Sequence, residues 1–357
     1  DGSSAQIGHG GLGDKSGTIT LTGTTTVADQ GDLTMASGSA ADAFTQIGHG
    51  GLDITSGTIA ATSVINVTNV NAVSLSGGAL ARSHSQIGNG GNGHAAAIGG
   101  DVRVAASGDI SLMGGAGDSA YSLIGLGGDN LGSTALAAVI DVVTTGGGIS
   151  LTSGAGNTAF SQIGIGGSGN AGAVSTTAFN VNARNDIVLN SAAGGFRSHT
   201  MIGMGGDAID GTKTGDINVT SSTGGVQLTS GANQDSFSMI GVGGQENTDG
   251  SIDGNVTVQT EGDITLMSGS GENAFTMIGQ GGNGAAGTKT GQVTVTSDNG
   301  GLSMTAGTPT AAEAGSFSMI GAGGHADASG AITTGVKVDV MNNIAMTSGA
   351  SNKGFTL

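Results

Sequence analysis

The sequence predicts an all-β fold: a right-handed parallel β-helix (β-solenoid) that occupies residues 1–357 as one continuous repeat array. Three observations predict it. The motif Ile-Gly-x-Gly-Gly recurs nine times, at spacings of 37 to 42 residues. Each repeat also holds three short segments in which apolar residues alternate with Thr or Ser, and this period favours strands over helices. Finally, 74 of the 357 residues are glycine, a residue that destabilises helices.

The first segment of each repeat ends on the isoleucine of the motif. Because a regular repeat places equivalent residues above one another, we expect these isoleucines to form a structural core column. The column consists of Ile7, Ile47, Ile87, Ile124, Ile163, Ile202, Ile240, Ile278 and Ile320.

The second segment carries a β-branched pair such as Val102 and Val104, and the third carries an aliphatic pair such as Ile110 and Leu112. The second and third segments lie 8 or 9 residues apart in every repeat, whereas 15 to 18 residues separate the motif from the second segment. Fixed corners beside one variable loop are typical of stacked coils. We therefore expect about nine rungs of about 39 residues, with three strands each and a rung spacing of about 4.8 Å.

Two features of the coil follow from general rules. Crossovers between parallel strands are normally right-handed, which favours a right-handed solenoid. A coil of about 20 residues, wound twice in each repeat, is the geometric alternative to one rung per repeat.

Both ends of the sequence fall within a repeat, and we expect the chain to be a fragment of a longer polypeptide.

One column contains only glycine or asparagine and lies two residues before the third segment. These residues adopt positive φ most readily, so we predict a left-handed turn at one corner of every rung. The turn column consists of Gly31, Asn71, Gly108, Gly147, Asn185, Gly224, Gly262, Gly300 and Asn342.

An aromatic or histidine column lies three residues before the isoleucines, on the opposite face of the strand. In one interpretation, the following loop covers these rings or a bulge turns them inward. In the other, they form an exposed packing interface for a neighbouring rod. The candidate interface column consists of Phe44, His84, Tyr121, Phe160, His199, Phe237, Phe275 and Phe317.

Glutamine and methionine share this face, and stacked glutamines can form amide ladders between rungs. The glycines of the motif weaken a strand unless a backbone must approach closely. We expect the long loop or a second rod to pack against them.

Charge and composition exclude several function classes. The formal net charge is −17 and only nine residues are Lys or Arg, which disfavours nucleic acid and anionic lipid as partners. The chain has no cysteine, and therefore no disulfides or thiolate metal sites. It has no apolar run long enough for a membrane-spanning helix, so we expect no membrane insertion.

Signs of chemistry are sparse, and we expect no catalytic, cofactor-binding or metal-binding residue. His9 and His49 occupy one column, where they could form a paired metal site or a tolerant boundary position. Aspartates recur before the third segment, where corner hydrogen bonding explains them. Calcium held by carboxylates and loop carbonyls is a weaker alternative. These aspartates are Asp32, Asp109, Asp186 and Asp263.

Two kinds of tract carry a resemblance. Gln46-Ile47-Gly48-His49-Gly50-Gly51 and Gly108-Asp109-Ile110-Ser111-Leu112 are similar to the repeats of filamentous-haemagglutinin-like giant bacterial surface proteins. The resemblance spans nearly the whole chain. It implies right-handed β-helix fibres, export to the cell surface or into a secreted filament of a bacterium, and no catalytic residue.

The leading hypothesis is therefore a structural module of an extracellular filament that self-associates into a fibre or bundle. The alternative is an adhesin that binds glycans or cell surfaces through the variable loops after the motif. A polysaccharide-degrading β-helix enzyme would need clustered acids, bases or a metal on one face, and the sequence places none there. An ice-binding plane would need Thr-x-Thr ranks in register, and Thr20-Leu21-Thr22 does not recur in that way.

Overall fold

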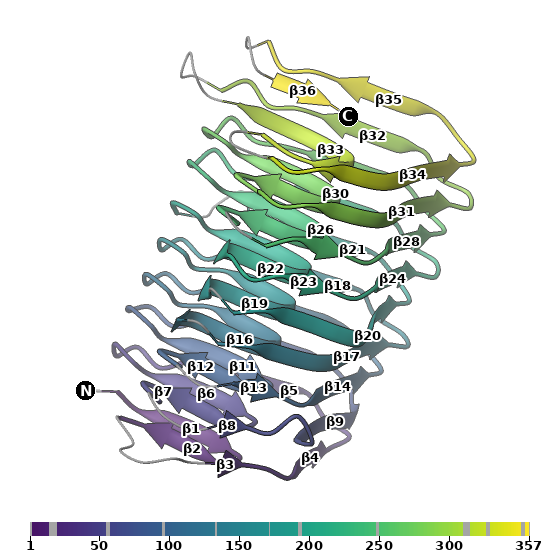
Figure 1. Ribbon diagram of the computed structural model, residues 1–357. Coiled ribbons are helices and arrows are strands. Elements are labelled where there is room, and N and C mark those ends of the chain that lie inside the picture. The colour runs from purple at the N-terminus through teal and green to yellow at the C-terminus, as the bar shows by residue number, and fades with distance from the viewer. Residues whose placement is uncertain are drawn as a thin grey trace.

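A computed structural model describes residues 2–13, 20–54, 58–94, 97–132, 134–170, 172–191, 195–247, 250–309, 315–325, 329–350 and 354–356. The chain coils through about eight turns of about 39 residues, and the rungs stack from the N-terminus to the C-terminus (Figure 1). The described ranges contain strands and no helix, and thus no helical segment able to cross a bilayer. The predicted solenoid with three strands in each rung is confirmed.

Three parallel sheets run the length of the stack, one for each segment of the repeat. Sheet A holds the motif strands β1 (Ser4–Ile7), β6 (Phe44–Ile47), β11 (His84–Ile87), β16 (Ser122–Gly132), β19 (Ser161–Asn170), β22 (His199–Ile209), β26 (Phe237–Gln245), β30 (Phe275–Asn283), β33 (Ser316–Gly323) and β36 (Gly354–Thr356), with the short strands β2 (Gly10–Leu12), β7 (Gly50–Leu52) and β12 (Gly90–Asn92). Sheet C holds the third segments, β5 (Leu33–Ala36), β10 (Val73–Ser76), β15 (Ile110–Met113), β18 (Ile149–Thr152), β21 (Ile187–Asn190), β25 (Val226–Thr229), β29 (Ile264–Met267), β32 (Leu302–Thr305) and β35 (Ile344–Thr347).

Sheet B is formed by the second segments, several of which are divided into a short and a long strand. Its members are β3 (Thr20–Leu21), β4 (Thr24–Ala28), β8 (Thr58–Ile59), β9 (Val64–Val70), β13 (Ile98–Gly99), β14 (Asp101–Ala106), β17 (Leu136–Thr144), β20 (Val174–Ala183), β23 (Lys213–Thr214), β24 (Ile217–Ser221), β27 (Ile252–Asp253), β28 (Val256–Thr260), β31 (Lys289–Ser297) and β34 (Ile332–Val340).

Equivalent residues of neighbouring repeats are paired throughout. Ile47 pairs with Ile87, and Leu75 of β10 pairs with Leu112 of β15. A coil of about 20 residues would pair residues half a repeat apart, so the register excludes that alternative.

The main core is the interior enclosed by the three sheets. Its hydrophobic cluster is continuous from Met35 to Ile320 and includes the motif isoleucines from Ile47 onward. Ile7 lies in the first rung and is 53% exposed, because a terminal rung has a neighbour on one side only.

The predicted left-handed turn column is wrong. None of its glycines has φ between +20° and +160°, and none of its asparagines is among the residues with positive φ. Close stacking explains the small residues instead. A Cβ added to Gly147 would lie 2.3 Å from the backbone carbon of Gly108 in the rung below, whereas the amide of Asn71 donates to Asp32 across the rungs at 2.6 Å.

The chain bends sharply at the motif, and the bend creates a second interior. An extended strand of seven residues spans about 23 Å. The Tyr121 hydroxyl nevertheless lies 2.6 Å from the position of a Cβ on Gly128, seven residues later. The glycine-rich end of the motif therefore folds back over the preceding strand. We call the space between them the side compartment. Its apolar clusters are separate from the main core.

Candidate functional site

A continuous stack of rings fills the side compartment. Neighbouring ring centroids are 4.6 to 5.1 Å apart, and their planes differ by 8° or less. Parallel strands are about 4.8 Å apart, so the rung spacing sets the ring spacing. The stack consists of Phe44, His84, Tyr121, Phe160, His199, Phe237, Phe275 and Phe317.

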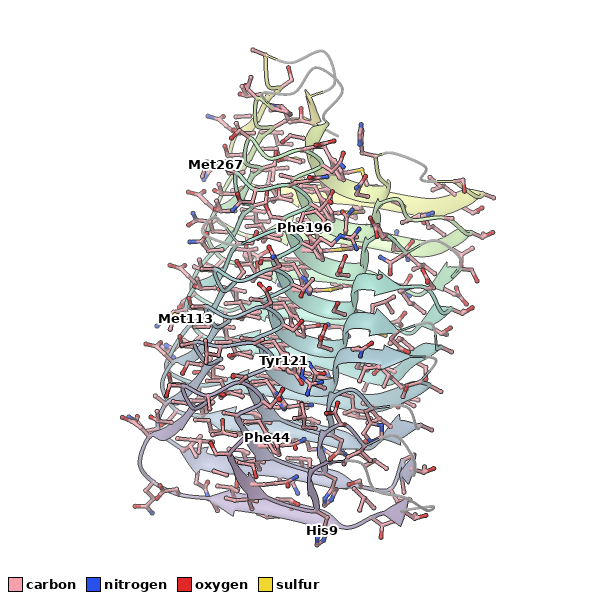
Figure 2. All side chains as sticks on the ribbon, turned by 90° about the vertical axis from the view of Figure 1, so that its left-hand side faces the viewer. His9, Phe44, Met113, Tyr121, Phe196 and Met267 are labelled. Carbon is pink, nitrogen blue, oxygen red and sulfur yellow. The ribbon has the colours of Figure 1, made fainter. Side chains whose placement is uncertain are left out.

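These rings are the candidate interface column, and the structure buries all of them. An exposed packing stripe is therefore wrong, and the interpretation in which the following segment covers the rings is correct. In Figure 2, Phe44 and Tyr121 lie over the middle of the rod, whereas Met113 and Met267 lie at its outer edge. The last two belong to sheet C and are exposed.

The motif glycines are required by the neighbouring rungs, not by a loop or a second rod. A Cβ on Gly125 would lie 1.8 Å from the carbonyl oxygen of Gly164 in the next rung, a distance that no side chain tolerates. Gly125 also has φ of 142°, which only glycine adopts readily. Stacked glycines thus let successive backbones meet without side chains between them.

Glutamine and methionine line the compartment beside the rings. The Nε2 atom of Gln46 donates to carbonyl oxygens of its own rung and of the next one, at His49, Gly88 and Gly90. Among the residues that the structure describes, the predicted amide ladder occurs once, between Gln6 and Gln46 at 3.2 Å. Elsewhere the glutamine amides bind the backbone of the bend and so hold it closed.

Left-handed turns close both ends of the folded-back segment. One column lies five residues before the isoleucines and the other lies six residues after them, each with φ between 50° and 90°. The first column consists of Asp42, Arg82, Ser119, Thr158, Arg197, Asp235 and Asn273, and the second of Gly13, Asp53, Gly93, Asn130, Gly169, Ala208, Glu246 and Gly284. No residue of the first column is glycine, so the glycine pattern of the sequence does not reveal it.

Two arginines bridge these turns and close the edge of the compartment. Arg82 binds Asp42 at 2.6 Å and holds Asp53 with two bonds of 3.0 Å. A bidentate arginine–carboxylate pair of this kind is geometrically specific.

The second arginine, Arg197, lies among three carboxylates. Its guanidinium contacts Asp207 at 3.8 Å and Asp235 at 4.0 Å, and it also binds Glu246. The pKa of Asp207 is raised to about 7, mainly by burial; Arg197 lowers it, and the charges of Glu246 and Asp235 raise it. The pKa of Asp235 is also raised, mainly by burial.

Both histidines of the ring stack are buried as neutral side chains. Burial lowers the pKa of His84 to about 4 and that of His199 to about 3. Each Nδ1 faces the carbonyl oxygen two residues earlier, on Arg82 or Arg197, and each Nε2 has no hydrogen-bond partner. A proton on either ring would therefore place an unpaired charge between two aromatic rings.

Two lysines replace apolar residues in a core column of sheet B. Lys213 and Lys289 are fully buried, and the ammonium of Lys289 donates to the carbonyl oxygens of Ala285, Gly287 and Ser329 at 2.7 to 3.0 Å. Burial lowers the pKa of Lys213 to about 8. These cations satisfy the backbone of the loop after the motif.

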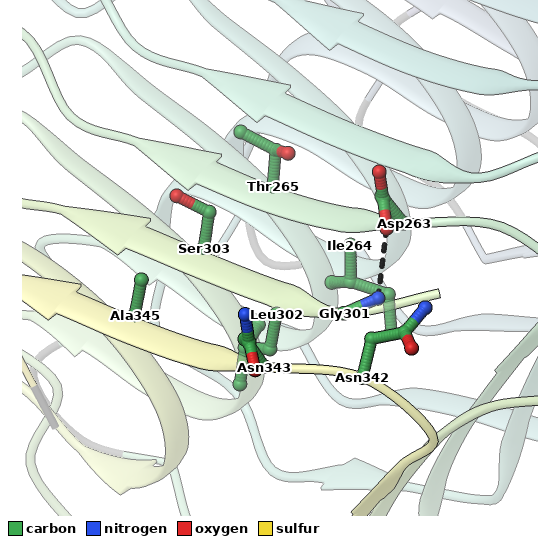
Figure 3. Close-up of a pocket in the computed structure, with 9 residues that line it drawn as sticks. All are labelled: Asp263, Ile264, Thr265, Gly301, Leu302, Ser303, Asn342, Asn343 and Ala345. Atoms are coloured by element: carbon green, nitrogen blue, oxygen red, sulfur yellow. Dashed lines mark hydrogen bonds between the residues drawn. The ribbon is translucent and has the colours of Figure 1, made fainter. Parts of the chain in front are cut away.

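The corner aspartates make the predicted hydrogen bonds. In each case Oδ1 accepts a backbone N–H from the next rung, as in the 2.7 Å bond from Gly301 to Asp263 (Figure 3). The four aspartates are 77 residues apart, which is two rungs, and the intervening rungs carry a small residue. The bonded pairs are Asp32 with Ala72, Asp109 with Gly148, Asp186 with Gly225 and Asp263 with Gly301.

His9 and His49 do not form a metal pair. Their rings are parallel, with centroids 5.0 Å apart, whereas two zinc–nitrogen bonds span at most about 4.2 Å. Nδ1 of His49 instead accepts the backbone N–H of His9. Within the described ranges, no three His, Asp or Glu side chains are arranged as a metal cluster.

The loops after the motif, considered above for glycan binding, lie partly outside the described residues, at 14–19, 55–57, 95–96, 133, 171, 248–249 and 326–328. Comparison with known proteins found no matching family model, no matching curated protein and no matching solved structure.

Proposed function

We propose that the chain is a structural module of an extracellular filament or surface fibre, in which rungs stack end to end into a shaft. The observation that carries the proposal is the unbroken register. The three sheets continue through every described rung, and equivalent residues are paired from first to last. Such an array contacts only its neighbouring rungs, so its length can increase without a change of design.

The last described rung presents an open apolar face. Ile344 of β35 is 56% exposed, and Val336 of β34 is 51% exposed. Their partners one rung earlier, Leu302 and Val293, are buried. A further rung of the same pattern would bury these side chains and would pair the unpaired strand edges. The placement outside the cell rests on the repeat resemblance alone.

Electron microscopy and sedimentation velocity of the purified chain test the proposal. We expect end-to-end particles whose lengths are multiples of one rod. The variant Val336→Lys/Ile344→Lys should remain monomeric, because it places two charges on the open face. Val188→Lys is the matched control, since Val188 lies on the outer face of β21. Wild-type particles that stay single at all concentrations would refute self-association through stacked rungs.

A further inference from the structure

A column of mostly buried and mostly polar side chains follows the folded-back segment, five residues after the motif isoleucines. In three consecutive rungs it is occupied by Asp207, Gln245 and Asn283, which are 2%, 1% and 4% exposed. The strand register pairs Asp207 with Gln245 and Gln245 with Asn283. Equivalent positions on neighbouring parallel strands face the same way, so the three side chains lie in line along the rod.

Each of these side chains has an acceptor oxygen without a donor: Oδ1 of Asp207, Oε1 of Gln245 and Oδ1 of Asn283. A buried polar atom left without a partner is costly, on the order of 1–3 kcal/mol. Such oxygens in adjacent rungs, as at Asp207 and Gln245, point to a shared ligand that accepts electron pairs, such as a metal ion.

The charge around this column is also unbalanced. Asp207, Asp235 and Glu246 surround one guanidinium, that of Arg197. At neutral pH an excess of negative charge therefore lies at a largely buried position, and it adds to burial, the main cause of the raised pKa values of Asp207 and Asp235. A cation would remove the excess, and a neutral ligand would not.

We propose that Asp207 and Gln245 form a Ca²⁺ site between adjacent rungs. Calcium prefers carboxylate and amide oxygens at about 2.3–2.6 Å. Two such bonds span up to about 5 Å, which accommodates the rung spacing of about 4.8 Å. The site depends on an amide oxygen beside one carboxylate, because the described residues contain no cluster of three acidic or imidazole ligands.

Isothermal titration of the whole chain with CaCl₂ at constant ionic strength tests the site. We expect about one saturable site with a dissociation constant in the range of about 10⁻⁴ to 10⁻³ M. The affinity should fall about fivefold from pH 7 to pH 6, because Asp207 must release its proton to bind.

Two variants keep side chains that the column already accepts elsewhere. Asp207→Asn introduces the residue found at Asn92 and Asn283, and Gln245→Leu introduces the residue found at Leu52. Each should weaken binding at least tenfold. Asp141→Asn, on the outer face of β17, should leave it unchanged. The proposal is overturned if no saturable heat appears up to about 10 mM Ca²⁺, or if both variants bind as tightly as Asp141→Asn.

Discussion

The main core and the side compartment are built from the same repeat by opposite means. In the main core, aliphatic side chains from three sheets interlock, and the backbone is ordinary strand. In the side compartment, one wall is a glycine-rich backbone with unusual φ values, packed directly against stacked rings. The first kind of interior tolerates exchanges among aliphatic residues. The second has no spare volume at its wall but accepts different rings, including histidine, in its stack.

The motif glycines should give the largest effect. Gly125→Ala would place a Cβ 1.8 Å from a carbonyl oxygen of the next rung, so we expect a loss of more than about 4 kcal/mol, or failure to fold. Gly132→Ala is the control, because Gly132 also has positive φ but nothing lies near its Cβ position. It should cost about 1 kcal/mol. Chemical denaturation measures both variants, and equal losses would contradict a steric role for the glycine wall.

Truncations compare the two interiors directly. Ile163→Ala in the main core should cost about 3–4 kcal/mol, because branched neighbours in three sheets refill a cavity poorly. Met239→Ala in the side compartment should cost about 2 kcal/mol, since the flexible neighbours Met201 and Met277 can partly refill the gap. Denaturation midpoints of the two variants give the comparison. A larger loss for Met239→Ala would show that the compartment is the more rigid region.

The buried histidines should make the compartment sensitive to acid. Their folded pKa values, about 4 and about 3, lie below the ordinary value of 6.5. Their stabilising contribution is therefore complete above pH 6.5 and is lost as the pH falls. Each should cost about 2 kcal/mol between pH 7 and pH 5. His84→Phe/His199→Phe should abolish this loss in denaturation at the two pH values. His9→Asn, on an exposed ring, should keep it.

Asp207, unlike the buried histidines, should make the folded protein more stable as the pH falls. Its folded pKa of about 7 is raised from 3.8, so the folded chain binds the proton more tightly and gains about 2 kcal/mol between pH 7 and pH 5. Asp207→Asn removes this gain, and the variant should lose more stability on acidification than the wild type. Identical pH profiles for the two proteins would contradict the buried position of this carboxylate.

Lys213 should show the smallest effect. Its pKa falls from 10.5 to about 8 on folding, so its protonation opposes folding fully below pH 8 and progressively less up to pH 10.5. Lys213→Met fits a column that holds Val174 and Ile252 on either side. We expect the free energy of unfolding of the variant to differ from that of the wild type by about 1 kcal/mol at pH 7. Between pH 8 and pH 10 it should depend less on pH than that of the wild type. Thermal denaturation across that range checks it.

The sequence predicts the coil well because equivalent residues must stack for the fold to exist. The spacing of the isoleucines is enough to place Ile47 over Ile87 and to define three strands in each rung. The corner aspartates are also predictable, since Asp109 follows a small residue at a fixed offset and its bond to Gly148 is local to the corner.

The side compartment could not be predicted in the same way. Glycine allows the chain to reverse but does not indicate in which direction it bends. The burial of Phe160 depends on that direction, which the sequence pattern does not specify. The left-handed turns fall on residues such as Arg82 and Thr158, which have no preference for positive φ. Conversely, the sequence predicts positive φ at Gly147, whereas the structure needs glycine there because a side chain would collide with the backbone of the rung below. Long-range packing decides these positions, and local propensity does not.

The alternation of the corner aspartates has a consequence for how such a shaft can change length. Each carboxylate accepts a backbone N–H from the rung above it. At one of these partners, Gly225, a Cβ would lie only 2.2 Å from the carbonyl oxygen of Asp263. Removing a glycine-bearing rung such as that of Gly225 would bring two aspartate-bearing rungs together and put a side chain where a Cβ has no room. Duplications and deletions that preserve the fold should therefore come in units of 77 residues, so that the inherited module is a pair of coils.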